Sequence, residues 1–181
     1  MNADKPDFLW RRRPIGADAR TRRWLLDRGS LTQRIQCRSA QFRVELISLT
    51  QAGPNRDESA LIDVGGRRAC VIRDVTLSSD GAVVVFAHSI AARRALRGPW
   101  RLLLTLGTRP LGAALFADPR VARQSLRFRQ VRRGHELFDA ASRRLDVAAA
   151  ALWARRSVFV FRGSRLLVTE VFLPAILALK P

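Results

Sequence analysis

Two stretches of alternating residues decide the fold. The first is residues 68–89, RACVIRDVTLSSDGAVVVFAHS, and the second is residues 157–173, SVFVFRGSRLLVTEVFL. Both are rich in β-branched and aromatic residues, and each contains a short turn sequence, at residues 78–81 (SSDG) and at residues 162–164 (RGS). Turns of this kind join neighbouring antiparallel strands. The sequence therefore predicts two β-hairpins.

The segments before and between the hairpins add helices and further strands. Apolar spacing predicts helices over residues 17–27 and 110–116, and a helical segment with a Gly-Pro break over residues 90–106. Alternation predicts strands over residues 42–47 and 126–131. Strands near both ends with helices between them predict an α+β fold, with a single antiparallel sheet of about six strands and helices packed on one face.

The length and composition favour one globular unit. A chain of 181 residues suits one domain with its own core, so residues 1–181 are expected to form a single domain. With 48% hydrophobic and 27% charged residues, the chain is not disordered, collagen-like or disulfide-stapled. Residues 1–16 are polar and contain prolines, which predicts a loosely held arm, and residues 51–66 predict a loop that is mobile.

The net charge of +18 raises the question of an anionic partner. Only two of the 33 basic residues are lysines, Lys5 and Lys180, and the arginines are spread along the whole chain. Proteins that bind nucleic acids gather their cations in one stripe and place aromatic rings among them, and this chain has no tyrosine. We therefore expect no nucleic-acid partner.

Other common classes of site lack their sequence signals. Cys37 and Cys70 are too few and too far apart for a disulfide framework or a metal motif, which favours a reducing cytoplasm and no structural metal. His88 and His135 stand outside any catalytic motif, and each is interpreted as a surface or core histidine. The most apolar stretch, residues 171–179, is too short to span a membrane. No nucleotide or dinucleotide motif is present, so no cofactor is expected.

Two charged residues stand in apolar rows. Alternation places Arg73 on the same strand face as Val71 and Val75, and it places Glu170 on a strand whose two faces are both apolar. A lone buried charge costs several kcal/mol unless it is paired or hydrogen-bonded. Two interpretations follow. Either Arg73 and Glu170 form an internal ion pair, or they face a closed pocket in which Arg73 binds the carboxylate of a small polar anion and Glu170 holds a hydroxyl or exchanges a proton.

Five blocks of sequence, taken in order, carry a family resemblance. They are residues 24–34 (WLLDRGSLTQR), 72–75 (IRDV), 107–116 (GTRPLGAALF), 153–157 (WARRS) and 166–174 (LLVTEVFLP). Each block alone is weak, but together they cover most of the chain. The chain resembles the chorismate pyruvate-lyase family, small enzymes without a cofactor that eliminate pyruvate from chorismate and form 4-hydroxybenzoate, the first committed step of ubiquinone biosynthesis.

The resemblance implies a fold and a set of site residues. It implies an antiparallel sheet of about six strands, a buried ligand site closed by helix-turn-helix flaps, and a monomer. It places a carboxylate-binding arginine at Arg73, a catalytic glutamate at Glu170, and ligand contacts through backbone amides at Leu31 and Leu111. The sequence departs from the family pattern at residues 86–89 (FAHS), where an arginine followed by threonine or serine is usual.

Two questions stay open at the level of sequence. Chorismate has a second carboxylate, on its enolpyruvyl group, and Arg155 and Arg156 are both candidates to bind it. The same fold family also resembles the effector-binding domains of some bacterial transcription regulators, so a non-catalytic domain that senses a small anion is the alternative function. Residues 1–23 are too few for the DNA-binding module that such a regulator carries.

Overall fold

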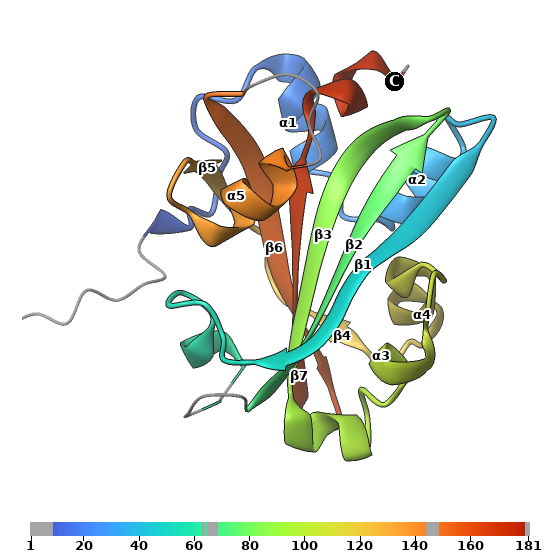
Figure 1. Cartoon of the computed structure of the whole chain (residues 1–181), viewed down its shortest axis with the longest axis vertical. Coiled ribbons are helices and arrows are strands. Elements are labelled where there is room, and N and C mark those ends of the chain that lie inside the picture. Colours follow the sequence, from blue (N-terminus) through green and yellow to red (C-terminus); the bar gives the residue numbers. More distant parts are fainter. Residues whose placement is uncertain (1–8, 63, 65–68, 144–148, 180–181) are drawn as a thin grey trace, which may run out of the picture.

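A single antiparallel sheet of seven strands forms the centre of the molecule (Figure 1). The structure is a computed structural model that describes residues 9–62, 64, 69–143 and 149–179. The strands are β1 (Phe42–Ala52), β2 (Cys70–Ser79), β3 (Ala82–Ala92), β4 (Ala122–Arg123), β5 (Arg127–Arg132), β6 (Ala151–Phe161) and β7 (Ser164–Phe172). Their order is β1-β2-β3-β7-β6-β4, with β5 also paired to β6. The predicted α+β fold is confirmed, with seven strands in place of about six.

Short helices cover the sheet. The α-helices are α1 (Ala19–Leu25), α2 (Leu31–Gln36), α3 (Leu102–Thr105), α4 (Leu111–Ala117) and α5 (Glu136–Ser142), and the 3-10 helices are η2 (Ser59–Leu61), η3 (Arg93–Arg97) and η4 (Pro174–Ala178). Polar caps start the first two helices: Asp18 accepts the N–H groups of Arg20 and Thr21, and Ser30 accepts that of Gln33. Within the described residues, no helix is both long and apolar enough to span a membrane.

Both predicted hairpins are present, and they pair with each other. Asp80 and Gly81 have φ angles of 51° and 87°, as a tight two-residue turn between β2 and β3 requires. The second hairpin joins β6 and β7 through a similar turn. Strand β3 then pairs with β7, with Ala87 opposite Glu170. Because Ala87 is also opposite Val75 on β2, this register places the row of Arg73 and the row of Glu170 on one face of the sheet.

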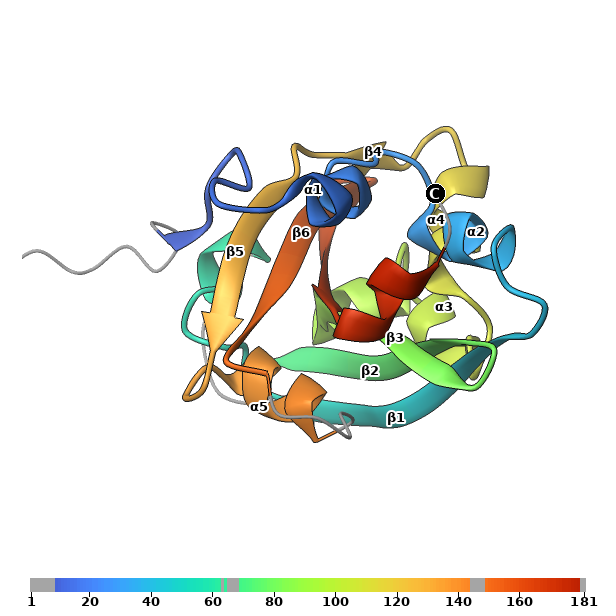
Figure 2. The ribbon, with the colours of Figure 1, turned by 90° about the horizontal axis from the view of Figure 1, so that it is seen from above.

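The sheet is buried on both faces. Seen from above, it curves, with β1 and β2 along one side, β5 and β6 along another, and α2, α3 and α4 on the concave side (Figure 2). Leu25, Leu31 and Ile35 pack there against Val75 and Ala87. Helix α5 was not predicted, and its apolar side chains pack against the opposite face of the sheet. Helices α1 to α4 thus follow the prediction of helices on one face, and α5 covers the other.

The segment before α1 is attached to the sheet. Arg11 forms an isolated β-bridge with Phe128, with N···O distances of 2.8 and 2.9 Å. The side chain of Trp10 is buried, and its indole N–H donates to Asp57 at 2.5 Å. These contacts correct the expectation of a loosely held arm for residues 9–16. The remaining part of that arm, residues 1–8, lies outside the described residues.

The predicted loop over residues 51–66 is also anchored where it is described. Its first two residues extend β1, and Asp57 and Glu58 are buried against the face of the sheet opposite α1 to α4. Asp57 accepts from Arg156 at 3.2 Å and lies 3.5 Å from Arg129. The described part of the loop is therefore held by buried ion pairs, which corrects the expectation of mobility. Residues 63, 65 and 66 of this loop lie outside the described residues.

His88 forms the centre of a charged cluster on the same face as Asp57. Its Nε2 lies 3.2 Å from Glu58, its Nδ1 lies 2.7 Å from Asp74, and only 5% of the residue is exposed. Burial by itself lowers the pKa of His88, but the two carboxylates outweigh burial and raise the pKa to about 10. His88 is therefore a charged core histidine, in agreement with the interpretation of it as a non-catalytic residue.

The raised pKa of His88 predicts a loss of stability at high pH. The folded-state pKa of about 10 lies above the ordinary value of 6.5, so the stabilisation is complete below about pH 6.5 and is lost as the pH rises through about 10. We expect His88→Gln to lower the free energy of unfolding, by most at about pH 6 and by least at about pH 10. Urea unfolding of both proteins at the two pH values measures the difference. A difference that does not change with pH contradicts the assignment.

Candidate active site

A cavity lies between the concave face of the sheet and two helical turns. The strands contribute Arg73, Ala87 and Glu170, and the helices contribute Leu31 and Leu111. The space between the lining atoms is about 600 Å³, including the part open to solvent. The four site residues that the family resemblance implies, Arg73, Glu170, Leu31 and Leu111, therefore line one cavity.

Arg73 reaches from β2 into this cavity and is only 2% exposed. Its Nη2 donates to the carbonyls of Gly107 and Arg109, at 2.8 and 3.1 Å, in the turn before α4. Its Nε is buried without a hydrogen-bond partner, and burial lowers the pKa of the guanidinium. No ion pair of Arg73 is found among the described residues. The site thus offers an unused donor on a buried cation, and such a donor needs an anionic or polar ligand.

The first residues of two helices line the same cavity. Leu31 and Leu111 are the first residues of α2 and α4, and the N–H of a first helical residue has no partner within its helix. The two helices approach each other at Gly112, where an added Cβ would lie 3.1 Å from Ser30 Oγ and 3.3 Å from Thr32 Oγ1. A side chain at position 112 has little space, so glycine allows the two covering turns to meet.

Glu170 is paired with Arg155 and not with Arg73. Its Oε2 accepts from Arg155 Nε at 2.5 Å, across the β6–β7 register that places the two residues opposite each other. No hydrogen bond to the other oxygen, Oε1, is found among the described residues. The side chain of Glu170 is 16% exposed, whereas that of Arg155 is fully buried. Of the two interpretations, the internal Arg73–Glu170 ion pair is therefore wrong, and both charged groups face the cavity.

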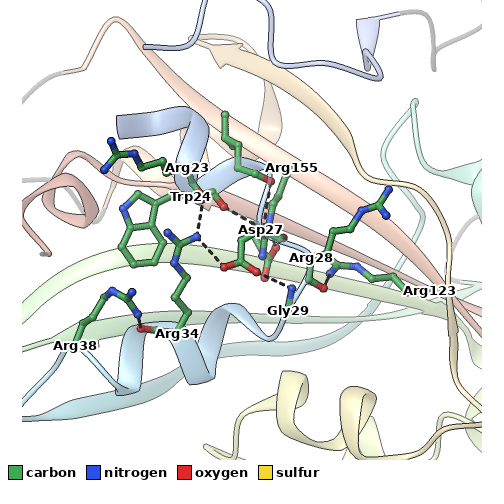
Figure 3. A network of polar contacts seen from close by, with 11 residues as sticks. Arg23, Trp24, Asp27, Arg28, Gly29, Arg34, Arg38, Arg123 and Arg155 are labelled. Carbon is green, nitrogen blue, oxygen red and sulfur yellow. Dashed lines mark hydrogen bonds and ion pairs between the residues drawn. The ribbon is translucent and has the colours of Figure 1, made fainter. Parts of the chain in front are cut away.

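Arg155 also holds the turn between α1 and α2 (Figure 3). Its Nη1 donates to the carbonyls of Trp24, Leu25 and Asp27, at 3.1, 3.3 and 2.7 Å. These carbonyls belong to the end of α1 and the turn after it, where a positive charge is favourable. One guanidinium therefore fixes both the carboxylate of Glu170 and the turn that leads to Leu31.

The α1–α2 turn has its own network of polar contacts. Asp27 accepts from the N–H of Gly29 at 2.6 Å and from Arg34 at 2.8 Å. The guanidinium of Arg34 lies 4.2 Å from the centre of the Trp24 ring, and Figure 3 shows it between that ring and Asp27. These contacts hold the turn in one conformation over the cavity.

Sequence reasoning missed Arg123, which also lines the cavity. Its Nε donates to Ser157 Oγ and its Nη1 to the carbonyl of Arg28, both at 2.8 Å. Its guanidinium lies 5.4 Å from the ring centres of Phe116 and Phe159. Arg123 lies in a strand of two residues without a motif, so no sequence pattern marks it.

The two arginines proposed for the second carboxylate have other roles in the structure. Arg155 is occupied by Glu170 and by carbonyls, and it does not line the cavity. Arg156 follows it in the strand and points to the opposite face, where its guanidinium lies 4.1 Å from the centre of the Trp10 ring and contacts Asp57. Neither arginine is therefore placed to bind a ligand in this cavity.

The other polar residues of interest lie elsewhere. The segment that departs from the family pattern, residues 86–89, is divided between the two faces of the sheet: His88 lies on the face opposite the cavity, whereas Ala87 and Ser89 line the cavity. His135 caps α5 by accepting the N–H of Leu137. Among the residues that the structure describes, no three His, Cys, Asp or Glu side chains are arranged to hold a metal ion.

Comparisons with known proteins identify the family of this chain. A family model described as chorismate lyase matches residues 11–179. The chain belongs to the chorismate lyase family. Two relatives in this family are named probable chorismate pyruvate-lyase. The relative from Thiobacillus denitrificans is 49% identical over 170 residues, which cover 94% of this chain and 91% of the relative. The relative from Aromatoleum aromaticum is 48% identical over 177 residues, which cover 94% of each chain.

Solved structures show that the fold of this chorismate lyase family member is shared with regulators. PhnF from Mycobacterium smegmatis has a TM-score of 0.57 and 16% identity, covering 82% of this chain and 65% of that chain. A GntR-family transcriptional regulator from Bacillus cereus has a TM-score of 0.56 and 11% identity, covering 75% and 93% of the two chains. At these identities the similarity is one of fold.

Removing Arg155 tests its double role in this site. Arg155→Met leaves the carboxylate of Glu170 and three carbonyls without their donor. We expect the free energy of unfolding to fall by about 3 kcal/mol or more, as for other broken buried pairs. Urea unfolding measures it. Arg120→Met is the control. It breaks an ion pair with Asp118 in which the arginine side chain is 65% exposed, so it is expected to cost much less stability than Arg155→Met. Equal losses in the two variants contradict the role of Arg155.

Proposed function

We propose that this protein is a chorismate pyruvate-lyase, which eliminates pyruvate from chorismate and forms 4-hydroxybenzoate. One observation carries the proposal beyond family membership. A buried guanidinium with an unused donor and a carboxylate with an uncommitted oxygen line the same cavity without pairing with each other. The aromatic product carries a carboxylate on one side of its ring and a hydroxyl on the other, so it matches a site with these two groups.

Arg73 and the two helix N-termini are proposed to bind the ring carboxylate. A guanidinium donates in a planar fork that suits a carboxylate, and the Nε of Arg73 is the donor that its carbonyl contacts leave free. The N–H groups of Leu31 and Leu111 add donors from the covering turns. The sheet and both covering turns thus supply hydrogen-bond donors to the ring carboxylate.

Glu170 is proposed to accept a hydrogen bond from the 4-hydroxyl. Arg155 occupies its Oε2 and fixes the plane of the carboxylate, which leaves Oε1 for the ligand. This arrangement orients the substrate ring between Arg73 and Glu170. A carboxylate that assists proton transfer in this way contributes about 10²- to 10⁴-fold to the rate of the chemical step.

The reaction breaks one carbon–oxygen bond and one carbon–hydrogen bond. The ether bond between ring carbon C3 and the enolpyruvyl oxygen breaks, C4 loses its hydrogen as a proton, and the ring becomes aromatic. A proton adds to the enolpyruvyl methylene, which gives pyruvate. Aromatisation makes the reaction strongly favourable, so the chain's own residues have to orient the substrate and stabilise developing charge. The proposal includes no cofactor, and it describes a cytoplasmic monomer.

A direct assay tests the proposed function. Purified protein is mixed with chorismate, and the absorbance of 4-hydroxybenzoate is followed over time. Turnover supports the lyase. Binding of chorismate without turnover would instead indicate a domain that senses a small anion, and neither binding nor turnover would reject both functions.

Replacing the carboxylate tests the role of Glu170. Glu170→Gln keeps the shape of the side chain but weakens the acceptor, so we expect kcat to fall by about 10²- to 10⁴-fold while 4-hydroxybenzoate still binds. Steady-state kinetics and calorimetric titration of the product measure the two effects. Glu45→Gln, on the exposed edge of β1, is the control. Turnover at the wild-type rate would remove Glu170 from the mechanism.

The path of the C4 proton separates two forms of the mechanism. In one form Glu170 accepts the proton and exchanges it with solvent. In the other the hydrogen passes within the substrate to the methylene carbon, and Glu170 orients the ring. With chorismate deuterated at C4, the first form predicts no deuterium in the methyl group of pyruvate, and the second predicts its transfer there. Mass spectrometry of the pyruvate reads the result.

A further inference from the structure

The charged side chains that line the cavity differ in whether they form ion pairs. Three charged side chains line it: Arg73, Arg123 and Glu170. The carboxylate of Glu170 already forms an ion pair with the guanidinium of Arg155. Among the described residues, neither Arg73 nor Arg123 forms an ion pair. The cavity therefore presents two guanidiniums that form no ion pair with the described residues.

Arg123 is held in place by neutral groups. The hydroxyl of Ser157 accepts from Nε and the carbonyl of Arg28 accepts from Nη1, and no partner of Nη2 is found in the described part of the chain. The rings of Phe116 and Phe159, which also line the cavity, lie on its guanidinium at equal distances of 5.4 Å. These contacts fix the plane of the guanidinium and leave its charge available to a ligand.

Arg123 contacts the part of the sheet that carries Glu170: Ser157, which accepts from Arg123, lies in β6, and β6 pairs with the strand of Glu170. Burial lowers the pKa of Arg123, and the charge of Glu170 opposes this effect. An arginine stays protonated in such surroundings, so it is a permanent cation beside the carboxylate that we assign to the 4-hydroxyl. On the substrate, the enolpyruvyl ether is attached to the carbon next to the one that carries this hydroxyl.

We propose that Arg123 is the binding site for the carboxylate of the enolpyruvyl group. This inference rests on the proposed function, because it assigns the second negative charge of the same substrate. Arg73 and Arg123 then match the two carboxylates of a dianion, one at each end of the ligand. The subsite selects substrates that carry a second carboxylate on the leaving group, and it holds that carboxylate while the ether bond breaks.

The substrate and the aromatic product differ in the contact that tests this subsite. 4-Hydroxybenzoate has only the ring carboxylate, so it does not use Arg123, whereas chorismate uses both arginines. We expect Arg123→Met to raise the KM for chorismate by about 10- to 100-fold, the loss of a charge-assisted hydrogen bond. The Kd for 4-hydroxybenzoate is expected to change by less than about twofold. Initial rates and calorimetric titration measure the two constants.

A control variant separates local binding from long-range attraction. Arg120→Met removes one positive charge from the same segment, and the side chain of Arg120 is 65% exposed. It is expected to change the KM by less than about twofold, because exposed charges are screened by salt. A KM increase equal to that of Arg123→Met would show general attraction and would overturn the subsite.

The possible results distinguish the subsite from a structural role. Arg123 also holds the α1–α2 turn through Arg28, so a purely structural role would weaken chorismate and 4-hydroxybenzoate by the same factor. That result, or an unchanged KM, overturns the inference and leaves the proposed function intact. If Arg123→Met does not fold, Arg123→Lys replaces it, because lysine keeps the charge without the planar fork. The KM for chorismate and the Kd for 4-hydroxybenzoate are then compared in the same way. Wild-type protein that does not convert chorismate overturns both proposals.

Discussion

The structure depends on contacts between buried guanidiniums and the main-chain carbonyls of the two covering turns. Arg73 donates to the α3–α4 turn, and Arg155 donates to the end of α1 and the turn after it. A guanidinium withdrawn from water needs acceptors, and carbonyls at turns and helix ends need donors. Each contact therefore satisfies two groups at once, and it attaches the helical cover to the sheet at the edge of the cavity.

The same contacts determine the chemistry of the cavity. A guanidinium has five N–H donors, more than the carbonyls around it accept, so donors remain for a ligand. Arg73 keeps a buried Nε without a partner for this reason, and Arg155 has a donor left to hold Glu170. The position of the α1–α2 turn and the orientation of Glu170 are set by one side chain, so a displaced turn would also disturb the carboxylate.

The face of the sheet opposite the cavity is held by charge in a similar way. Glu58 and Asp74 surround His88, and Asp57 contacts Arg156. Because the two carboxylates keep the pKa of His88 high, the histidine supplies a positive charge at this position across most of the pH range. His88 thus supplies a cation to this cluster, and the charge of that cation depends on pH.

Turn residues between alternating segments were sufficient to predict the two hairpins. Because side chains of a strand point alternately to its two faces, the sequence also marked Arg73 and Glu170 as charges in apolar rows. The family resemblance added Leu31 and Leu111. Alternation describes only one strand at a time, so it does not state which of two neighbouring arginines, Arg155 or Arg156, lies on the same face of the sheet as Glu170. Pairing of β6 with β7 decides this, since it places Arg155 opposite Glu170. The partner of Glu170 and the presence of Arg123 in the cavity likewise depend on contacts between segments far apart in the chain, which only the packed tertiary structure brings together.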